Sequence, residues 1–99
     1  MKYAINSNLR KLSKADFLKL CTPKNIPNKN KILEYLKSFD AEYCSAALVY
    51  DVVTGKETQT DELGFTDGEY TWYSSWIYHF EKYNLKLNDD FIEHILKAT

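Results

Sequence analysis

The sequence of 99 residues predicts a small α+β domain that is mostly helical, with four to five helices and one β-hairpin at residues 62–73. Three observations lead to this prediction. Apolar residues recur at helical spacing in several segments, and an Asp-Gly pair separates two stretches of alternating pattern. In addition, nine of the fifteen aromatic residues fall within residues 65–91. Aromatic residues this dense must fill a small core or contact a partner. We expect residues 1–99 to form a single globular domain.

The first two helices are predicted at residues 14–21 and 29–39. The first begins after Ser13, a favourable N-cap residue, and its apolar residues recur at intervals of three and four. The stretch 22–28 contains two prolines and ends this helix, because proline cannot continue one. Asn28 then caps the second helix, whose apolar residues line one face while its lysines fall largely elsewhere.

Residues 44–54 are ambiguous between a helix and a strand. Three valines in this segment favour a strand. Ser45 as an N-cap, the two alanines after it, and Gly55 at the position of a helix-ending glycine favour a short helix. The period of a short apolar run does not separate the two structures. The helix is the preferred interpretation, and the strand stays open.

The hairpin at residues 62–73 is predicted from its turn and its flanks. Asp67 and Gly68 supply the positive φ angles of a tight turn. On the C-terminal side, alternating strand-type residues place Tyr70 and Tyr73 on opposite faces, so only one of them points inward. A single hairpin is marginally stable alone, so this one must lie on helices.

Two further helices complete the predicted fold. The first spans residues 75–84, with Ser74 or Ser75 as its cap and Asn84 as a left-handed terminator. Asn88 caps the second, and two aspartates occupy its first turn, where carboxylates favour the positive end of the helix dipole.

Charge is distributed unevenly along the chain. Residues 1–40 hold nine Lys or Arg and three acidic residues, a balance of +6, whereas residues 41–99 hold four Lys and eleven acidic residues, a balance of −7. If the two halves of the sequence also form two sides of the surface, this polarity steers a charged partner. If the halves interleave in the fold, their charges cancel. The alternative is that the carboxylates of residues 51–69 bind no partner and only keep the hairpin soluble and its edge strands from pairing. The candidate partner-binding residues are the carboxylates of residues 51–69 and one tyrosine: Asp51, Glu57, Asp61, Glu62, Asp67, Glu69 and Tyr70.

No stretch of the sequence indicates a catalytic mechanism, a metal site or a cofactor site, so we do not expect an enzyme. His79 and His94 each lack a Cys or His partner at helical spacing, and both are expected at the surface or its rim. The three glycines form no phosphate-binding loop. Cys21 and Cys44 lack the C-x-x-C spacing and are expected to be free buried thiols of a reducing compartment.

The hydropathy pattern predicts a cytoplasmic protein without a membrane partner. No apolar run approaches the roughly 20 residues that span a bilayer. The N-terminal residues lack the apolar core and the cleavage site of a secretory signal.

A pattern of turn and core residues over about residues 32–95 carries a resemblance. These residues are Tyr35-Leu36-Lys37, Tyr50 to Gly55, Thr66-Asp67-Gly68, Trp72, Tyr78, Tyr83-Asn84, Leu87 and Phe91-Ile92. In this pattern the chain resembles the cognate immunity proteins of polymorphic-toxin and contact-dependent growth-inhibition systems. It departs from that pattern at Asn88, where a proline is expected ahead of the final helix.

The resemblance implies a cytoplasmic, non-enzymatic protein that binds one bacterial toxin domain directly and neutralises it. Such toxins are often nucleases with basic clefts, in which carboxylates can take the places of substrate phosphates. The resemblance does not carry over binding residues, and it does not predict whether the protein self-associates. The alternative function is a nucleic-acid-associated or regulatory module that uses the lysine-rich N-terminal helices. The net charge of −1 and the single arginine, Arg10, are unlike a specific nucleic-acid binder.

Overall fold

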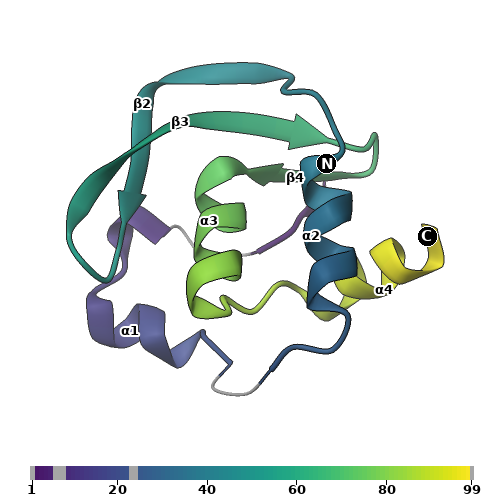
Figure 1. Cartoon of the computed structure of the whole chain (residues 1–99), viewed down its shortest axis with the longest axis horizontal. Coiled ribbons are helices and arrows are strands. Elements are labelled where there is room, and N and C mark those ends of the chain that lie inside the picture. Colours follow the sequence, from purple (N-terminus) through teal and green to yellow (C-terminus); the bar gives the residue numbers. More distant parts are fainter. Residues whose placement is uncertain (1, 6–8, 23–24, 99) are drawn as a thin grey trace.

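Four α-helices and four strands, with one short 3₁₀ turn, make up the part of the chain that the computed structural model describes, residues 2–5, 9–22 and 25–98 (Figure 1). The helical elements are η1 (Leu9–Lys11), α1 (Lys14–Lys19), α2 (Lys29–Lys37), α3 (Ser74–Tyr83) and α4 (Asp89–Ala98). The strands are β1 (Lys2–Tyr3), β2 (Tyr43–Asp51), β3 (Lys56–Thr66) and β4 (Tyr70–Tyr73). The predicted helix-ending loop 22–28 includes residues 23–24, which lie outside the described residues.

The prediction of a mostly helical domain with a single hairpin is wrong. About 41% of the structure is helical and 31% is strand, and the strands form a four-stranded mixed sheet. The preferred helix at residues 44–54 is a strand, β2, followed by a turn. Val49 and Asp51 are buried whereas Tyr50 between them is exposed, an alternation that a strand satisfies and a helix does not. Gly55, with φ of 73°, belongs to the turn that leads into β3.

The sheet has the strand order β1-β4-β3-β2. The strand β1 runs parallel to β4, and the other two pairs are antiparallel. The turn predicted at Asp67 and Gly68 lies between β3 and β4. Gly68 has φ of 97° as predicted, whereas the positive φ predicted for Asp67 is wrong. The hairpin predicted at residues 62–73 is therefore only the middle of a larger sheet. The pairing of β2 with β3 shifts register twice, so these two long strands form an irregular, curved ribbon (Figure 1).

The core lies between the inner face of the sheet and the helices. Tyr70 and Trp72 of β4 are 2% and 0% exposed, and Trp72 Nε1 donates a hydrogen bond to the Leu36 carbonyl at 3.2 Å. In Figure 1 the helix α3 lies beneath the arch of the β2–β3 ribbon, with α2 beside it. The helices contribute large buried residues to this core: Phe17, Ile32, Leu36, Ile77, Phe80, Phe91 and Ile95.

The helix ends follow local signals in most places. Ser13 caps α1, because its Oγ accepts a hydrogen bond from the Asp16 backbone N–H at 3.2 Å. Asn84 ends α3 with φ of 59°, as predicted. Asn28 occupies the N-cap of α2 but makes no side-chain capping bond. The N-cap of α3 is Tyr73 and not one of the two serines that follow it, so that capping prediction is wrong.

Candidate protein-binding face

The seven candidate residues do not form one acidic surface. Asp51 and Tyr70 are 2% exposed, and the Asp67 side chain is 4% exposed. Glu62 is half-buried and accepts a hydrogen bond from the Ser75 backbone N–H at 2.9 Å, at the start of α3. The three exposed members are separated along the long strand β3: Glu57 and Asp61 belong to the strand itself, and Glu69 lies in the turn beyond its other end.

Asp51 joins the β2–β3 turn to α3. Its Oδ2 accepts hydrogen bonds from the hydroxyls of Tyr78 and Tyr83, at 2.6 and 2.8 Å. Its Oδ1 accepts the backbone N–H groups of Val53 and Thr54, at 2.8 and 3.0 Å. Burial alone would raise the pKa of Asp51, but these hydrogen bonds hold it well below its usual value. We therefore assign Asp51 a structural role.

Asp67 joins the β3–β4 turn to α2 and α4. Its Oδ2 accepts a hydrogen bond from the Tyr35 hydroxyl and another from His94 Nε2 at 2.7 Å. Its Oδ1 accepts the backbone N–H groups of Glu69 and Tyr70, at 2.9 and 2.8 Å. Burial alone would raise the pKa of Asp67, but the hydrogen bonds lower it to about 2. The half-buried His94 is thus held by the fold.

His79 is fully buried, contrary to the predicted surface position. Its Nε2 accepts a hydrogen bond from the Val52 backbone N–H at 3.1 Å, and its Nδ1 lies 2.6 Å from the Ser75 carbonyl, to which it donates. These two contacts fix a neutral imidazole with the proton on Nδ1. Burial lowers the pKa of His79.

The free energy of unfolding is expected to fall when the pH drops below about 6.5, the ordinary pKa of histidine. Because the folded chain lowers the pKa of His79, the unfolded chain binds a proton first. The stabilisation by neutral His79 is therefore complete above about pH 6.5 and is lost as the pH falls toward the folded-state value. Urea midpoints at about pH 7.5 and about pH 5.5 measure this loss. His79→Gln should show a smaller difference between the two midpoints, and an equal difference would contradict the assignment.

Four aromatic residues form a continuous row that links three strands to α3. The row consists of Tyr43 of β2, Tyr73 of β4, Trp76 of α3 and Tyr3 of β1. The two residues in its middle, Tyr73 and Trp76, are half-buried, and Trp76 packs against the core. Successive ring centroids lie 6.0, 4.8 and 6.3 Å apart. Tyr73 faces away from the core because its neighbour Trp72 faces into it. The two ends of the row are solvent-exposed, Tyr3 by 49% and Tyr43 by 52%.

The row depends on Gly64 of β3, which pairs with both Tyr43 and Tyr73. The Tyr43 ring lies directly over Gly64, where an added Cβ would fall 2.2 Å from a ring carbon. Hydrogen bonding with Tyr43, together with burial, raises the pKa of Tyr73 to about 12. The absence of a side chain at residue 64 therefore allows the two tyrosines to meet across β3.

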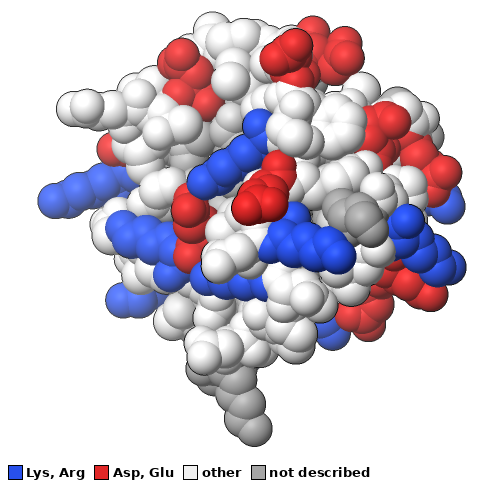
Figure 2. Space-filling view, turned by 45° about the vertical axis from the view of Figure 1, so that its right-hand side comes forward, with Lys and Arg blue, Asp and Glu red and all other residues white. Residues whose placement is uncertain are grey.

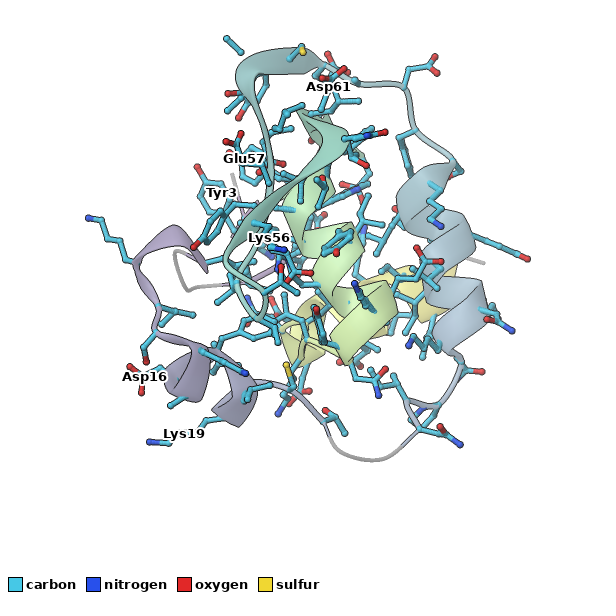
Figure 3. The ribbon with its side chains drawn as sticks, turned by 60° about the vertical axis from the view of Figure 1, so that its left-hand side comes forward. Tyr3, Asp16, Lys19, Lys56, Glu57 and Asp61 are labelled. Carbon is cyan, nitrogen blue, oxygen red and sulfur yellow. The ribbon has the colours of Figure 1, made fainter. Side chains whose placement is uncertain are left out.

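A shallow hollow of about 490 Å³ lies on the β2–β3 hairpin. Glu57 stands opposite Tyr50, and Asp61 stands opposite Leu48, so each carboxylate neighbours an apolar residue of β2. Tyr50 is 38% exposed. Figure 3 shows Glu57 and Asp61 along the hairpin, with Tyr3 toward the same side of the view. The residues that line the hollow are Ala47, Leu48, Tyr50, Gly55 and Glu57.

In Figure 2 basic side chains lie mainly in a band across the middle of the view with acidic side chains among them, and further acidic side chains lie at the top and right. Lys29 Nζ donates to the Glu81 carbonyl at 2.9 Å and to Asn84 Oδ1 at 2.6 Å. Lys37 Nζ donates to both carboxylate oxygens of Glu81 at 3.1 Å. These lysines fasten α2 to α3, so no specific observation favours the nucleic-acid-binding alternative.

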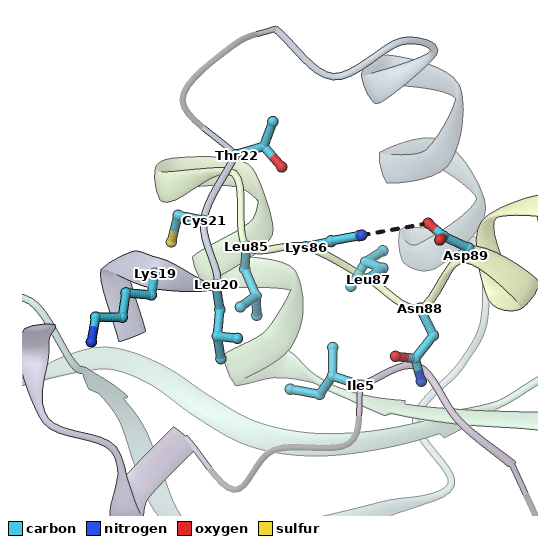
Figure 4. Close-up of a pocket in the computed structure, with 10 residues that line it drawn as sticks. All are labelled: Ile5, Lys19, Leu20, Cys21, Thr22, Leu85, Lys86, Leu87, Asn88 and Asp89. Carbon is cyan, nitrogen blue, oxygen red and sulfur yellow. Dashed lines mark ion pairs between the residues drawn. The ribbon is translucent and has the colours of Figure 1, made fainter. Parts of the chain in front are cut away.

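A second hollow, also of about 490 Å³, lies between the end of α1 and the segment that joins α3 to α4 (Figure 4). Leu85 and Leu87 contribute buried apolar surface to it. Its two lysines are both paired, Lys86 with Asp89 and Lys19 with Asp16, each at 3.9 Å. Among the described residues that line it, the hollow therefore presents no unpaired charge for a ligand.

No protein-family model, no curated protein and no solved structure matches this chain. Among the described residues, no group of three or more His, Cys, Asp or Glu side chains is placed to hold a metal ion. In the same part of the chain, none of the helices has the length and apolar character needed to cross a membrane. Cys21 and Cys44 are both free thiols, and Cys44 is exposed, contrary to the predicted burial.

Proposed function

We propose that this protein is a cytoplasmic immunity protein that neutralises a cognate bacterial toxin, a nuclease in the simplest case, by binding it directly. The observation that carries the proposal is the aromatic row, Tyr3, Trp76, Tyr73 and Tyr43, whose two end tyrosines are solvent-exposed. The resemblance of residues 32–95 to immunity proteins supports the same function.

The aromatic row has the composition of a binding hot spot. Tyrosine and tryptophan are enriched at the centres of protein interfaces, where truncation of one residue typically costs about 2 kcal/mol or more of binding free energy. The rings contact one another edge to face, so they are already ordered before a partner arrives. Such preorganisation reduces the entropic cost of association.

The exposed carboxylates have a separate role in this proposal. Glu57 and Asp61 attract a basic surface and raise the association rate, whereas the aromatic row supplies most of the affinity. A nuclease cleft that binds phosphates is such a basic surface. Asp51 and Tyr70 are excluded from partner contact because they are buried.

Purification of the protein from its native operon tests the proposal. We expect one other protein to remain bound, and its gene, expressed alone, to stop bacterial growth. Adding the purified immunity protein should block the activity of the partner in vitro at an equimolar ratio. A partner that is harmless when expressed alone, or whose activity is unaffected by the immunity protein, would contradict the proposal.

Gly64→Ala is expected to weaken toxin binding about ten-fold while the fold persists. The new methyl group displaces the Tyr43 ring, which is half exposed and can rotate into solvent. Calorimetric titration with the toxin measures the affinity, and thermal unfolding of the free variant measures its stability. Gln59→Ala is the control, because Gln59 is an exposed residue of the same strand, β3, and takes no part in the aromatic row. Equal affinities of Gly64→Ala and the unmodified protein would contradict the role of the row.

A further inference from the structure

The strand β2 is an edge of the sheet. In the order β1-β4-β3-β2 it pairs with β3 on one side, and no strand of the described residues pairs with its other side. Alternate backbone N–H and C=O groups of an edge strand point outward and can pair with another extended chain. At nine residues, β2 is long for an edge strand.

This edge carries two irregularities in its pairing with β3 but lacks the chemical protections against pairing with another chain. Edge strands of soluble proteins are commonly blocked by charged side chains, by proline or by shortness. From Tyr43 to Tyr50 the sequence is YCSAALVY, which contains no charged residue and no proline. Most of these residues are exposed or half-buried, and Val49 is the single fully buried member. The strand is therefore open to a partner chain.

Carboxylates frame this uncharged strand. We call them the acidic frame: Asp40 and Glu42 before the start of β2, and Glu57 and Asp61 on the neighbouring strand β3. All four are exposed. Lys56 is the single cation between residues 40 and 61. The chemistry that complements an open edge within an acidic frame is an extended segment that carries positive charge.

We propose that an extended segment of the toxin, with lysine or arginine at alternate positions, adds to the outer edge of β2. This inference rests on the proposed function and names the structure that the toxin presents. An added strand lies about 5 Å from β2 and about 10 Å from β3. Lysine and arginine side chains are long enough to cross Leu48 and Tyr50 and to reach Asp61 and Glu57, which stand opposite those two residues.

The charges disfavour a second copy of this protein on the same edge. In an antiparallel pair of two β2 strands, the start of one strand meets the end of the other. Glu42 of one copy then approaches Tyr50 and Glu57 of the other, which places like charges close together. A basic segment experiences attraction at the same positions.

A synthetic peptide tests the inference without the toxin. The probe is a nine-residue peptide of alternating threonine and lysine, and its comparison has glutamate in place of lysine. At low salt we expect the lysine peptide to bind at least about ten-fold more tightly than the glutamate peptide. The lysine peptide should also slow hydrogen exchange at alternate backbone amides of β2. The double substitution Glu57→Lys, Asp61→Lys should reverse the preference between the peptides, whereas Asp16→Lys, Glu34→Lys, with the same change in net charge, should preserve it.

Three results would overturn the inference. The first is equal binding of the two peptides. The second is hydrogen exchange that the lysine peptide slows only at amides outside β2. The third is a protein that has twice the monomer mass in solution and whose β2 amides exchange slowly without any peptide. That result would show that a second copy occupies the edge. If the protein protects cells against the toxin while the peptide test fails, the proposed function stands and the strand addition does not. If the peptide binds as expected but the protein protects no cell, the proposed function is wrong, while the binding of a basic segment to β2 stands.

Discussion

Asp51→Ala is expected to lower the free energy of unfolding by about 3 kcal/mol or more, the largest effect among the carboxylates. The substitution removes the acceptor of two tyrosine hydroxyls and of two backbone N–H groups. The backbone donors belong to the β2–β3 turn and the tyrosine donors belong to α3, so without the carboxylate the turn is no longer hydrogen-bonded to the helix. Urea unfolding followed by circular dichroism measures the change.

Glu57→Ala is the matched control, because Glu57 is an exposed carboxylate of the same hairpin. Its free energy of unfolding should stay within about 0.5 kcal/mol of the unmodified protein. The folded chain holds the pKa of Asp51 below its ordinary value of 3.8, so its stabilisation is complete above that pH and is lost on further acidification. Asp51→Ala should therefore also reduce the acid sensitivity of the fold below about pH 4. Equal unfolding midpoints for Asp51→Ala and Glu57→Ala would contradict the structural role of Asp51.

The double substitution Tyr3→Ala, Tyr43→Ala is expected to weaken toxin binding about a thousand-fold, since each hot-spot aromatic contributes about 2 kcal/mol. The two residues are the most exposed members of the aromatic row, at 49% and 52%. Their removal should leave the thermal unfolding of the free protein nearly unchanged, because neither fills the core. Calorimetric titration or surface binding kinetics measure the loss, which we expect mainly in the dissociation rate.

Leu18→Ala is the matched control for this loss. Leu18 is 46% exposed but lies on α1, outside the aromatic row. Its substitution removes a similar exposed apolar side chain and should leave the affinity for the toxin unchanged. If Leu18→Ala weakens binding as much as the double tyrosine substitution, the partner does not use the aromatic row.

Sequence reasoning located all four α-helices because each carries an amphipathic pattern and most carry an end signal, such as Ser13 or Asn84. It missed β2 because Ser45, the following alanines and Gly55 have local preferences that suit a helix equally well. Pairing with β3 and packing on α3 decide between the two structures, and both are contacts between distant parts of the chain. With β2 as a helix, the four-stranded sheet could not be predicted.

The candidate site was predicted only in part, because charge along the sequence does not show which carboxylates are buried and hydrogen-bonded within the fold. Asp51 and Asp67 each stand at the start of a turn. Each accepts hydrogen bonds from the backbone N–H groups two and three residues later in the chain, which is a common role of aspartate in turns. The position of an aspartate at the start of a turn was therefore the sequence signal that Asp51 and Asp67 have a structural role. The aromatic row was missed because Tyr3 and Tyr43 lie far from Tyr73 in the sequence and meet it only through the sheet. His79 was predicted at the surface or its rim but is fully buried, and it accepts a hydrogen bond from Val52 of the β2–β3 turn, which lies far from it in the sequence.

Growth of bacteria that express the toxin from the native operon tests the central claim most directly. The claim is that this protein acts by presenting its aromatic row to another protein. Co-expression of the unmodified protein is predicted to restore growth, whereas the Tyr3→Ala, Tyr43→Ala variant, present at the same level and folded, should fail to restore it. Full protection by that variant, or no protection by the unmodified protein, would contradict the claim.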